Sequence, residues 1–174
     1  DNYLNFQPNI KVDENKRIYS ILTNTPKDFK HFLNIKYQVD IANSHPLLFS
    51  HYIINKYNMP INTLQTIHDI PYTNINGTCY DGKQVCNNLD KRLLEFVVNA
   101  KIPLDILKYI YLTSKGKFWD EFKFDEEVKG LPRQLIKKNL FREVFYSNSK
   151  KSLNRKFERL FAKQYPSVFS LIMQ

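Results

Sequence analysis

Residues 37–52 carry the sequence Y-Q-V-D-I-A-N-S-H-P-L-L-F-S-H-Y. Apolar residues lead into a single acid, Asp40, and a short polar turn ending at Pro46 opens a new apolar run. This order predicts a buried strand that ends in a carboxylate and passes into a helix with proline near its first position. In one interpretation, Asp40 only caps the following helix or is solvated. In the other, it serves as a metal ligand at a rigid strand end. The second interpretation depends on a further motif downstream.

Composition limits the kind of protein and its partners. The chain has 174 residues, 43% of them hydrophobic, which is enough for one sizeable core. Its net charge of +9 favours an acidic partner, nucleic acid before membrane, and no run is long and apolar enough to cross a bilayer. Eleven basic residues but only two acids follow Val128, so the last quarter is expected to face a polyanion.

The cysteines point to the compartment. Cys79 and Cys86 lie in a polar loop beside the sequon Asn76-Gly77-Thr78, where a secreted protein could form a disulfide and be glycosylated. No signal peptide is visible, and the many lysines and asparagines suit a cytoplasmic or phage-type protein. We therefore expect a cytoplasmic protein.

Residues 132–146 form the second informative element, because they follow the helix-start signal Lys129-Gly130-Leu131-Pro132. On a helical wheel of about 100° per residue, Arg133 and Lys137 fall inside the apolar stripe instead of opposite it. Either Arg133 lies in the exposed first turn and Lys137 reaches out of the core, or the helix lines a cleft. In the second case two cations and the ring of Phe141 would suit a nucleoside triphosphate, with cations on phosphates and the ring on a base.

The remaining chain is predicted to be mostly helical. A strand is expected over 17–23, and helices are expected over 46–57, 89–100, 104–113, 152–165 and from Pro166 onward. Residues 58–88 lack sustained periodicity and are interpreted as an excursion or insertion. The expected organisation is a segment 1–57, an insertion with connecting helices 58–128, and a basic helical segment 129–174.

Four segments resemble family A DNA polymerases and their single-subunit relatives, and they follow one another along the chain in the order that the family has. Val39-Asp40-Ile41-Ala42-Asn43-Ser44-His45-Pro46 is similar to motif A, and also to the D-x-x-S-L-Y-P-S motif of family B. Arg133, Lys137 and Phe141 match the O-helix pattern R-x-x-x-K-x-x-x-[FY]. The other two segments begin at Arg17, similar to "G-R-L-x-S…L-P", and at Phe157, similar to "F-F-x-x-Y-P-x-V".

The resemblance implies a fold. The fold would be α+β and helix-rich, a partial right-hand polymerase architecture with a small antiparallel palm sheet carrying Asp40. A helical fingers lobe would be hinged near Gly130-Leu131-Pro132. The implied activity is template-directed nucleotidyl transfer with Mg²⁺, dNTPs and a DNA primer–template, RNA being possible.

The resemblance also implies a role for each matching residue. Asp40 would bind the catalytic magnesium ions. Arg133 and Lys137 would grip the triphosphate, Phe141 would stack at the nascent pair, and His45 would be the sugar gate. Tyr146 would act on the template side. The nucleic acid itself would be contacted by basic residues near the start of the chain and in the last basic helix: Arg17, Arg155, Lys156 and Arg159.

The two-metal reaction needs a second carboxylate, which the family supplies from motif C, H-D-[ES] on a hairpin beyond the O-helix. No such motif follows Pro166, and Ile67-His68-Asp69-Ile70 has the letters but precedes the O-helix. A further polypeptide carrying motif C is one expectation. The alternatives are a non-catalytic basic nucleic-acid-binding module derived from a polymerase fold, and a helical structural or interaction protein.

Overall fold

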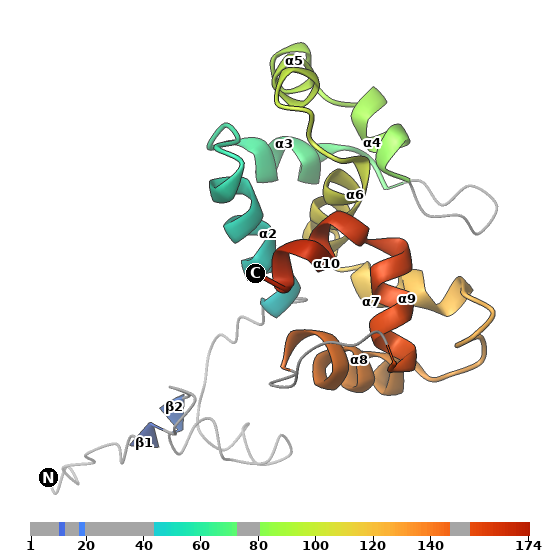
Figure 1. Cartoon of the computed structure of the whole chain (residues 1–174). Coiled ribbons are helices and arrows are strands. Elements are labelled where there is room, and N and C mark those ends of the chain that lie inside the picture. The colour runs from blue at the N-terminus through green and yellow to red at the C-terminus, as the bar shows by residue number, and fades with distance from the viewer. Residues whose placement is uncertain (1–10, 13–17, 20–43, 73–80, 147–153) are drawn as a thin grey trace, which may run out of the picture. The chain divides into compact units, whose positions relative to one another are not determined.

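The computed structural model describes residues 11–12, 18–19, 44–72, 81–146 and 154–174 (Figure 1). The chain forms two compact units, Asp1–Ile41 and Ala42–Gln174. In the first unit, β1 (Lys11–Val12) pairs antiparallel with β2 (Ile18–Tyr19), with Val12 opposite Ile18. β2 falls within the strand predicted over 17–23. The predicted strand ending in Asp40 lies outside the described residues.

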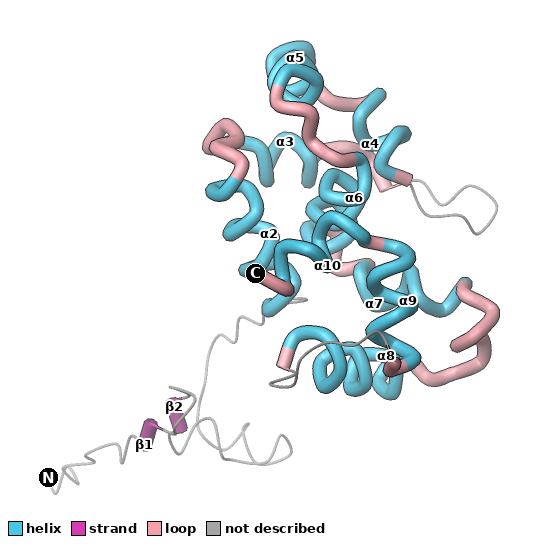
Figure 2. The backbone as a smooth tube through the Cα atoms, in the orientation of Figure 1, coloured by secondary structure: helices cyan, strands magenta, loops and turns pink. Residues whose placement is uncertain are grey.

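Helices and the loops between them make up the described part of the second unit (Figure 2). In chain order the helices are α2 (Ser44–Lys56), α3 (Thr63–Asp69), α4 (Gly82–Asn87), α5 (Lys91–Asn99), α6 (Leu104–Ser114), α7 (Phe118–Glu121), the 3-10 helix η2 (Phe122–Phe124), α8 (Arg133–Leu140), the π-helix η3 (Phe141–Phe145), α9 (Lys156–Gln164) and α10 (Pro166–Ile172). Helices are therefore the only regular elements among the described residues of the second unit.

The predicted α+β class, with a small antiparallel palm sheet and a partial right-hand polymerase architecture, is wrong. Among the described residues, the only strands are β1 and β2, of two residues each, and all other regular elements are helices. The physical reason is the spacing of apolar residues, which recur every three or four positions in the second unit instead of every second position. Ile136, Leu140 and Val144, for example, are all fully buried at intervals of four.

Helix α6 is the centre of the second unit. It buries residues on all sides, as an interior helix does, and α2, α3, α4 and α10 pack against it (Figure 1). The approach of α4 requires glycine, since a Cβ on Gly82 would lie 1.9 Å from the carbonyl oxygen of Leu104. Helices α3, α4 and α5 lie at one end of this unit (Figure 1), where the close backbone approach at Gly82 joins α4 to α6.

Aromatic side chains hold α7, η2 and α9 against the other end of α6. The ring of Phe118 lies 5.2 Å from that of Tyr109 on α6, 5.4 Å from Phe122 and 5.9 Å from Tyr165, between centroids. Most of these contacts are edge-on, the arrangement that the ring quadrupole favours. Helices α8 and η3 pack against this layer of aromatic side chains.

The long helices predicted from periodicity are confirmed, and residues 58–88, interpreted as an excursion or insertion, contain two short helices that were not predicted. That region contains α3 and α4, of seven and six residues, which are too short to display two full periods. His68 and Asp69 end α3, so the letters of motif C stand here on a helix and not on a hairpin. Gly116 follows the end of α6 with a φ of +69°, and Gly130 precedes α8 with a φ of +82°. Glycine adopts such a backbone without strain.

Candidate functional site

Helix α8 presents the two predicted phosphate-binding cations one turn apart. It begins after Pro132, which is its N-cap, and buries Ile136 and Leu140. Arg133 and Lys137 lie four residues apart and are both half-buried beside this buried face. The wheel prediction that both cations lie at the apolar stripe is therefore confirmed.

Arg133 is held by a carboxylate from α7. Its Nε lies 3.2 Å from Oδ1 of Asp120, and the same oxygen lies 2.8 Å from Nζ of Lys123. A guanidinium carries five N–H donors, and the carboxylate lies beside the one on Nε. Because the side chain of Arg133 is still 37% exposed, it can meet a second anion from solvent.

Lys137 lies against two aromatic rings. Its Nζ is 5.9 Å from the centroid of Trp119 and 5.8 Å from that of Phe141, both within the range of cation–π attraction. The two rings lie 5.0 Å apart. The ammonium group of Lys137 is therefore held beside aromatic rings of α7 and η3.

A π-helical turn brings Phe141 and Tyr146 onto the same face. The backbone N–H of Tyr146 donates to the carbonyl oxygen of Phe141, five residues earlier, at 2.8 Å. In an α-helix, residues five apart point in different directions, whereas a π-turn closes after five residues. The rings of Phe141 and Tyr146 consequently stack, with centroids 5.4 Å apart and planes 24° apart.

His45 joins this group from the first turn of α2. Its Nε2 shares a hydrogen bond with Oη of Tyr146, and its ring lies edge-on, 5.3 Å from both Phe141 and Tyr146. The five described residues predicted to bind a nucleotide therefore form one group on α8, η3 and α2. We call it the cation–aromatic cluster; its members are His45, Arg133, Lys137, Phe141 and Tyr146.

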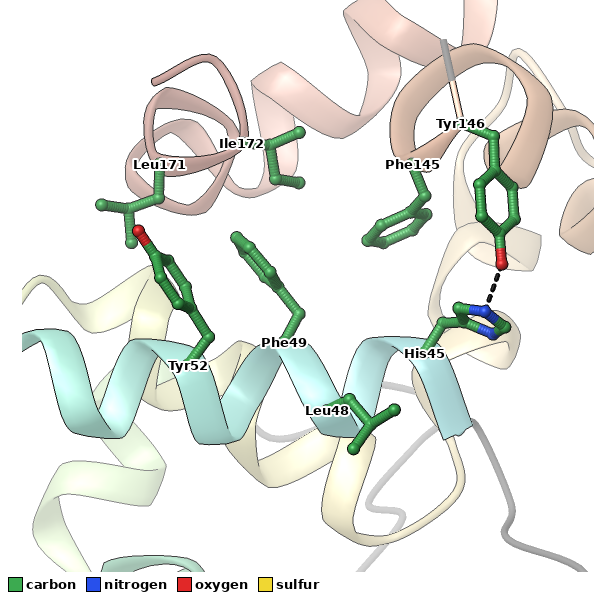
Figure 3. Close-up of a pocket in the computed structure, with 8 residues that line it drawn as sticks. All are labelled: His45, Leu48, Phe49, Tyr52, Phe145, Tyr146, Leu171 and Ile172. Carbon is green, nitrogen blue, oxygen red and sulfur yellow. Dashed lines mark hydrogen bonds between the residues drawn. The ribbon is translucent and has the colours of Figure 1, made fainter. Parts of the chain in front are cut away.

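A pocket of about 460 Å³ adjoins the cluster (Figure 3). Three elements line it, with His45, Leu48, Phe49 and Tyr52 from α2, Phe145 and Tyr146 from the end of η3, and Leu171 and Ile172 from α10. The hydrogen-bonded pair of His45 and Tyr146 stands at one end, and Phe49 and Tyr52 rise from α2 toward α10. The lining is mostly apolar, with a few polar groups that could orient a ligand.

The predicted nucleic-acid contacts at the start of α9 lie on a helix that packs against α8 and η3. Arg155, Lys156 and Arg159 are all exposed at the start of this helix. Lys156 donates to the carbonyl oxygen of Glu127, and Arg159 donates to that of Asn154 at 3.2 Å. These three basic side chains form a second basic feature, at the start of α9.

The predicted metal ligand is Asp40. Asp40 and Arg17 lie outside the described residues, so neither is placed relative to Lys137. Within the described ranges, no group of three or more His, Cys, Asp or Glu side chains could hold a metal ion. Asp120 already forms ion pairs with two cationic side chains, those of Arg133 and Lys123. Magnesium binding therefore remains a prediction that depends on Asp40.

Trp119 and Asp120 belong to the surroundings of the cluster and were not predicted to take part. The sequence shows only an aromatic spacing, Phe118-Trp119-x-x-Phe122, which predicts packing and not the partner. Their position beside α8 depends on how the chain turns back after η2, through residues 125–132. No local pattern specifies that turn.

Within the described part of the chain, none of the helices is both long and apolar enough to span a bilayer. Comparison with protein-family models, with curated proteins and with solved structures finds no match.

Proposed function

We propose that the chain binds a nucleoside triphosphate at the cation–aromatic cluster and serves template-directed nucleotidyl transfer, using magnesium and a DNA primer–template. The supporting observation is that two segments singled out separately, one around His45 and one over 133–146, meet in space. His45 contacts both Phe141 and Tyr146 at 5.3 Å between ring centroids. Residues that resemble polymerase motifs would be expected to meet in this way if they share one nucleotide.

Each member of the cluster has a part in this proposal. The guanidinium fork of Arg133 and the ammonium of Lys137 neutralise phosphate oxygens, which carry most of the charge in phosphoryl transfer. The ring of Phe141 offers a stacking surface for a base. His45 and Tyr146 supply polar groups at the sugar, and Asp40 would hold the magnesium ion. A second carboxylate from a further polypeptide would complete the reaction, which would take place in the cytoplasm.

Binding of Mg-dNTP to the full chain tests the proposal. We expect Lys137→Ala to weaken binding at least about tenfold, because a charged hydrogen bond to phosphate is lost. Lys138→Ala is the matched control, since Lys138 is the adjacent lysine and is exposed on the other face of α8. Asp40→Ala should remove the magnesium dependence. Equal effects of the two lysine variants, or no binding by the unaltered chain, would contradict the proposal.

A second candidate is a non-catalytic nucleic-acid-binding module, favoured by the exposed basic side chains at the start of α9. Such a module would bind DNA or RNA through phosphates, with an affinity that falls steeply as salt rises. Its binding would survive Asp40→Ala and Lys137→Ala but fall in the double variant Arg155→Ala, Lys156→Ala. Measuring both ligands on the same variants separates the two functions.

A further inference from the structure

Helix α7 supplies two consecutive residues that each contact one cation of the cluster. Asp120 pairs with Arg133, with Oδ1 and Nε 3.2 Å apart, and the ring of Trp119 lies 5.9 Å from Nζ of Lys137. Both contacts run from α7 to α8, two elements that pack directly on each other. Neither α7 residue belongs to a segment that resembles a polymerase motif.

The carboxylate of Asp120 lies beside the Nε side of the guanidinium group. Its Oδ1 sits between Nε of Arg133 and Nζ of Lys123, at 3.2 Å and 2.8 Å. An ion pair centred on Nε leaves the edge between the two terminal nitrogens, which is the fork that binds phosphate in pairs of hydrogen bonds. Asp120 can therefore hold Arg133 without occupying its phosphate-binding edge.

Trp119 performs the equivalent task for Lys137. The indole is only 1% exposed and packs between the rings of Phe118, at 4.8 Å, and Phe141, at 5.0 Å. Its orientation is thus fixed by the core. A lysine side chain has four flexible carbons and loses much rotamer freedom when it binds an anion. A rigid ring that already restrains the ammonium lowers that loss.

We propose that Trp119 and Asp120 are positioning residues that preorganise Lys137 and Arg133 for the phosphates of the nucleotide. This inference rests on the proposed function. Two effects of Asp120 on phosphate affinity oppose each other, because Asp120 also places a negative charge beside an anion site. Repulsion alone would make Asp120→Asn bind phosphate more tightly, whereas loss of positioning makes it bind more weakly. Lys123 already neutralises much of the Asp120 charge, so we expect the loss of positioning to dominate.

The test uses the full chain and inorganic tripolyphosphate, which carries the phosphates without base or sugar. The chain has a single tryptophan, Trp119, so its fluorescence reports directly on the surroundings of Lys137. We expect a fluorescence change on binding, which Lys137→Ala removes. Asp120→Asn should weaken binding about fivefold, and Asp120→Glu should restore part of the affinity because it keeps a carboxylate.

The matched control is Glu126→Gln, which makes the same change in net charge. The side chain of Glu126 is 82% exposed, and its ion-pair partner is Lys129, at 3.1 Å, not Arg133 or Lys137. Its affinity should stay within about twofold of the unaltered chain. Trp119→Phe, measured by calorimetry, should weaken binding about threefold, since the smaller ring is a poorer cation–π partner.

Two results overturn the inference in different ways. If Asp120→Asn binds tripolyphosphate equally well or more tightly while Arg133→Ala and Lys137→Ala bind weakly, positioning by α7 is wrong and the nucleotide site stands. If the unaltered chain binds neither tripolyphosphate nor dNTP, the proposed function fails as well. Circular dichroism of each variant confirms that the helices are intact before binding is compared.

Discussion

His45 and Tyr146 share a hydrogen bond between Nε2 and Oη although 101 residues separate them in the sequence. The bond ties the first turn of α2 to the end of η3 and stands at one end of the pocket (Figure 3). It is also the point at which the two sequence motifs meet. Because both side chains are exposed, its main expected effect is on ligand binding and not on folding.

The first prediction concerns this hydrogen bond. We expect Tyr146→Phe to weaken dNTP binding about fivefold and leave tripolyphosphate binding unchanged, because the hydroxyl is assigned to the sugar and not to the phosphates. Tyr52→Phe is the matched control, since Tyr52 lines the same pocket and is 46% exposed against 45% for Tyr146. In a double-mutant cycle with His45→Phe, the coupling should be about 0.5–1.5 kcal/mol. A coupling near zero would exclude cooperation of the pair in binding.

The cations of α8 could be predicted from sequence because their helix is strongly periodic. Ile136, Leu140 and Val144 define the buried face, so the position of Arg133 and Lys137 relative to it follows from the helical period alone. That relation is local. It needs no knowledge of which element packs on the face.

The π-turn was not predictable from the same pattern. A wheel of constant angle places Phe145, four residues after Phe141, nearest to the Phe141 face. In the structure the i→i+5 hydrogen bond instead brings Tyr146 there. Likewise the contacts of Asp120 with Arg133 and of Trp119 with Lys137 depend on tertiary packing, which local periodicity does not specify.

The second prediction concerns the attachment of η3 to α9. The carboxylate of Glu143 is 7% exposed, and it accepts a hydrogen bond from the backbone N–H of Phe157 at 3.0 Å, in the first turn of α9. An anion is favourable at a helix N-terminus. Glu143→Ala leaves that buried N–H without its acceptor, and we expect a loss of about 1–3 kcal/mol in the free energy of unfolding. Urea denaturation measures it, and Glu126→Ala on the exposed loop should change it by less than about 0.5 kcal/mol.

The third prediction tests the packing of α4 on α6. A methyl group at Gly82 would lie 1.9 Å from the carbonyl oxygen of Leu104, so the two helices must move apart. We expect Gly82→Ala to lower the free energy of unfolding by about 1–3 kcal/mol, even though alanine is the better helix former. Lys83→Ala, at the exposed next position, is the control. An unchanged or raised urea midpoint for Gly82→Ala would show that α4 does not approach α6 so closely.

The last prediction is a pH dependence that comes from Tyr109. Its side chain is fully buried in α6 and donates to the carbonyl oxygen of Pro46 at 3.2 Å, and burial raises the pKa of its hydroxyl well above the ordinary value. The unfolded chain therefore releases this proton at a lower pH than the folded chain does. The stability it contributes is present below about pH 10 and is lost as the pH rises toward the folded pKa.

Tyr109→Phe should lower the free energy of unfolding at pH 8 by about 1 kcal/mol, through the lost hydrogen bond. Above pH 10 it should also flatten the decline of stability, by up to about 1.4 kcal/mol per pH unit. Urea unfolding of both proteins between pH 8 and pH 11 measures the two slopes. Parallel curves for Tyr109→Phe and the unaltered chain would mean that Tyr109 ionises as easily in the folded protein as in the unfolded one.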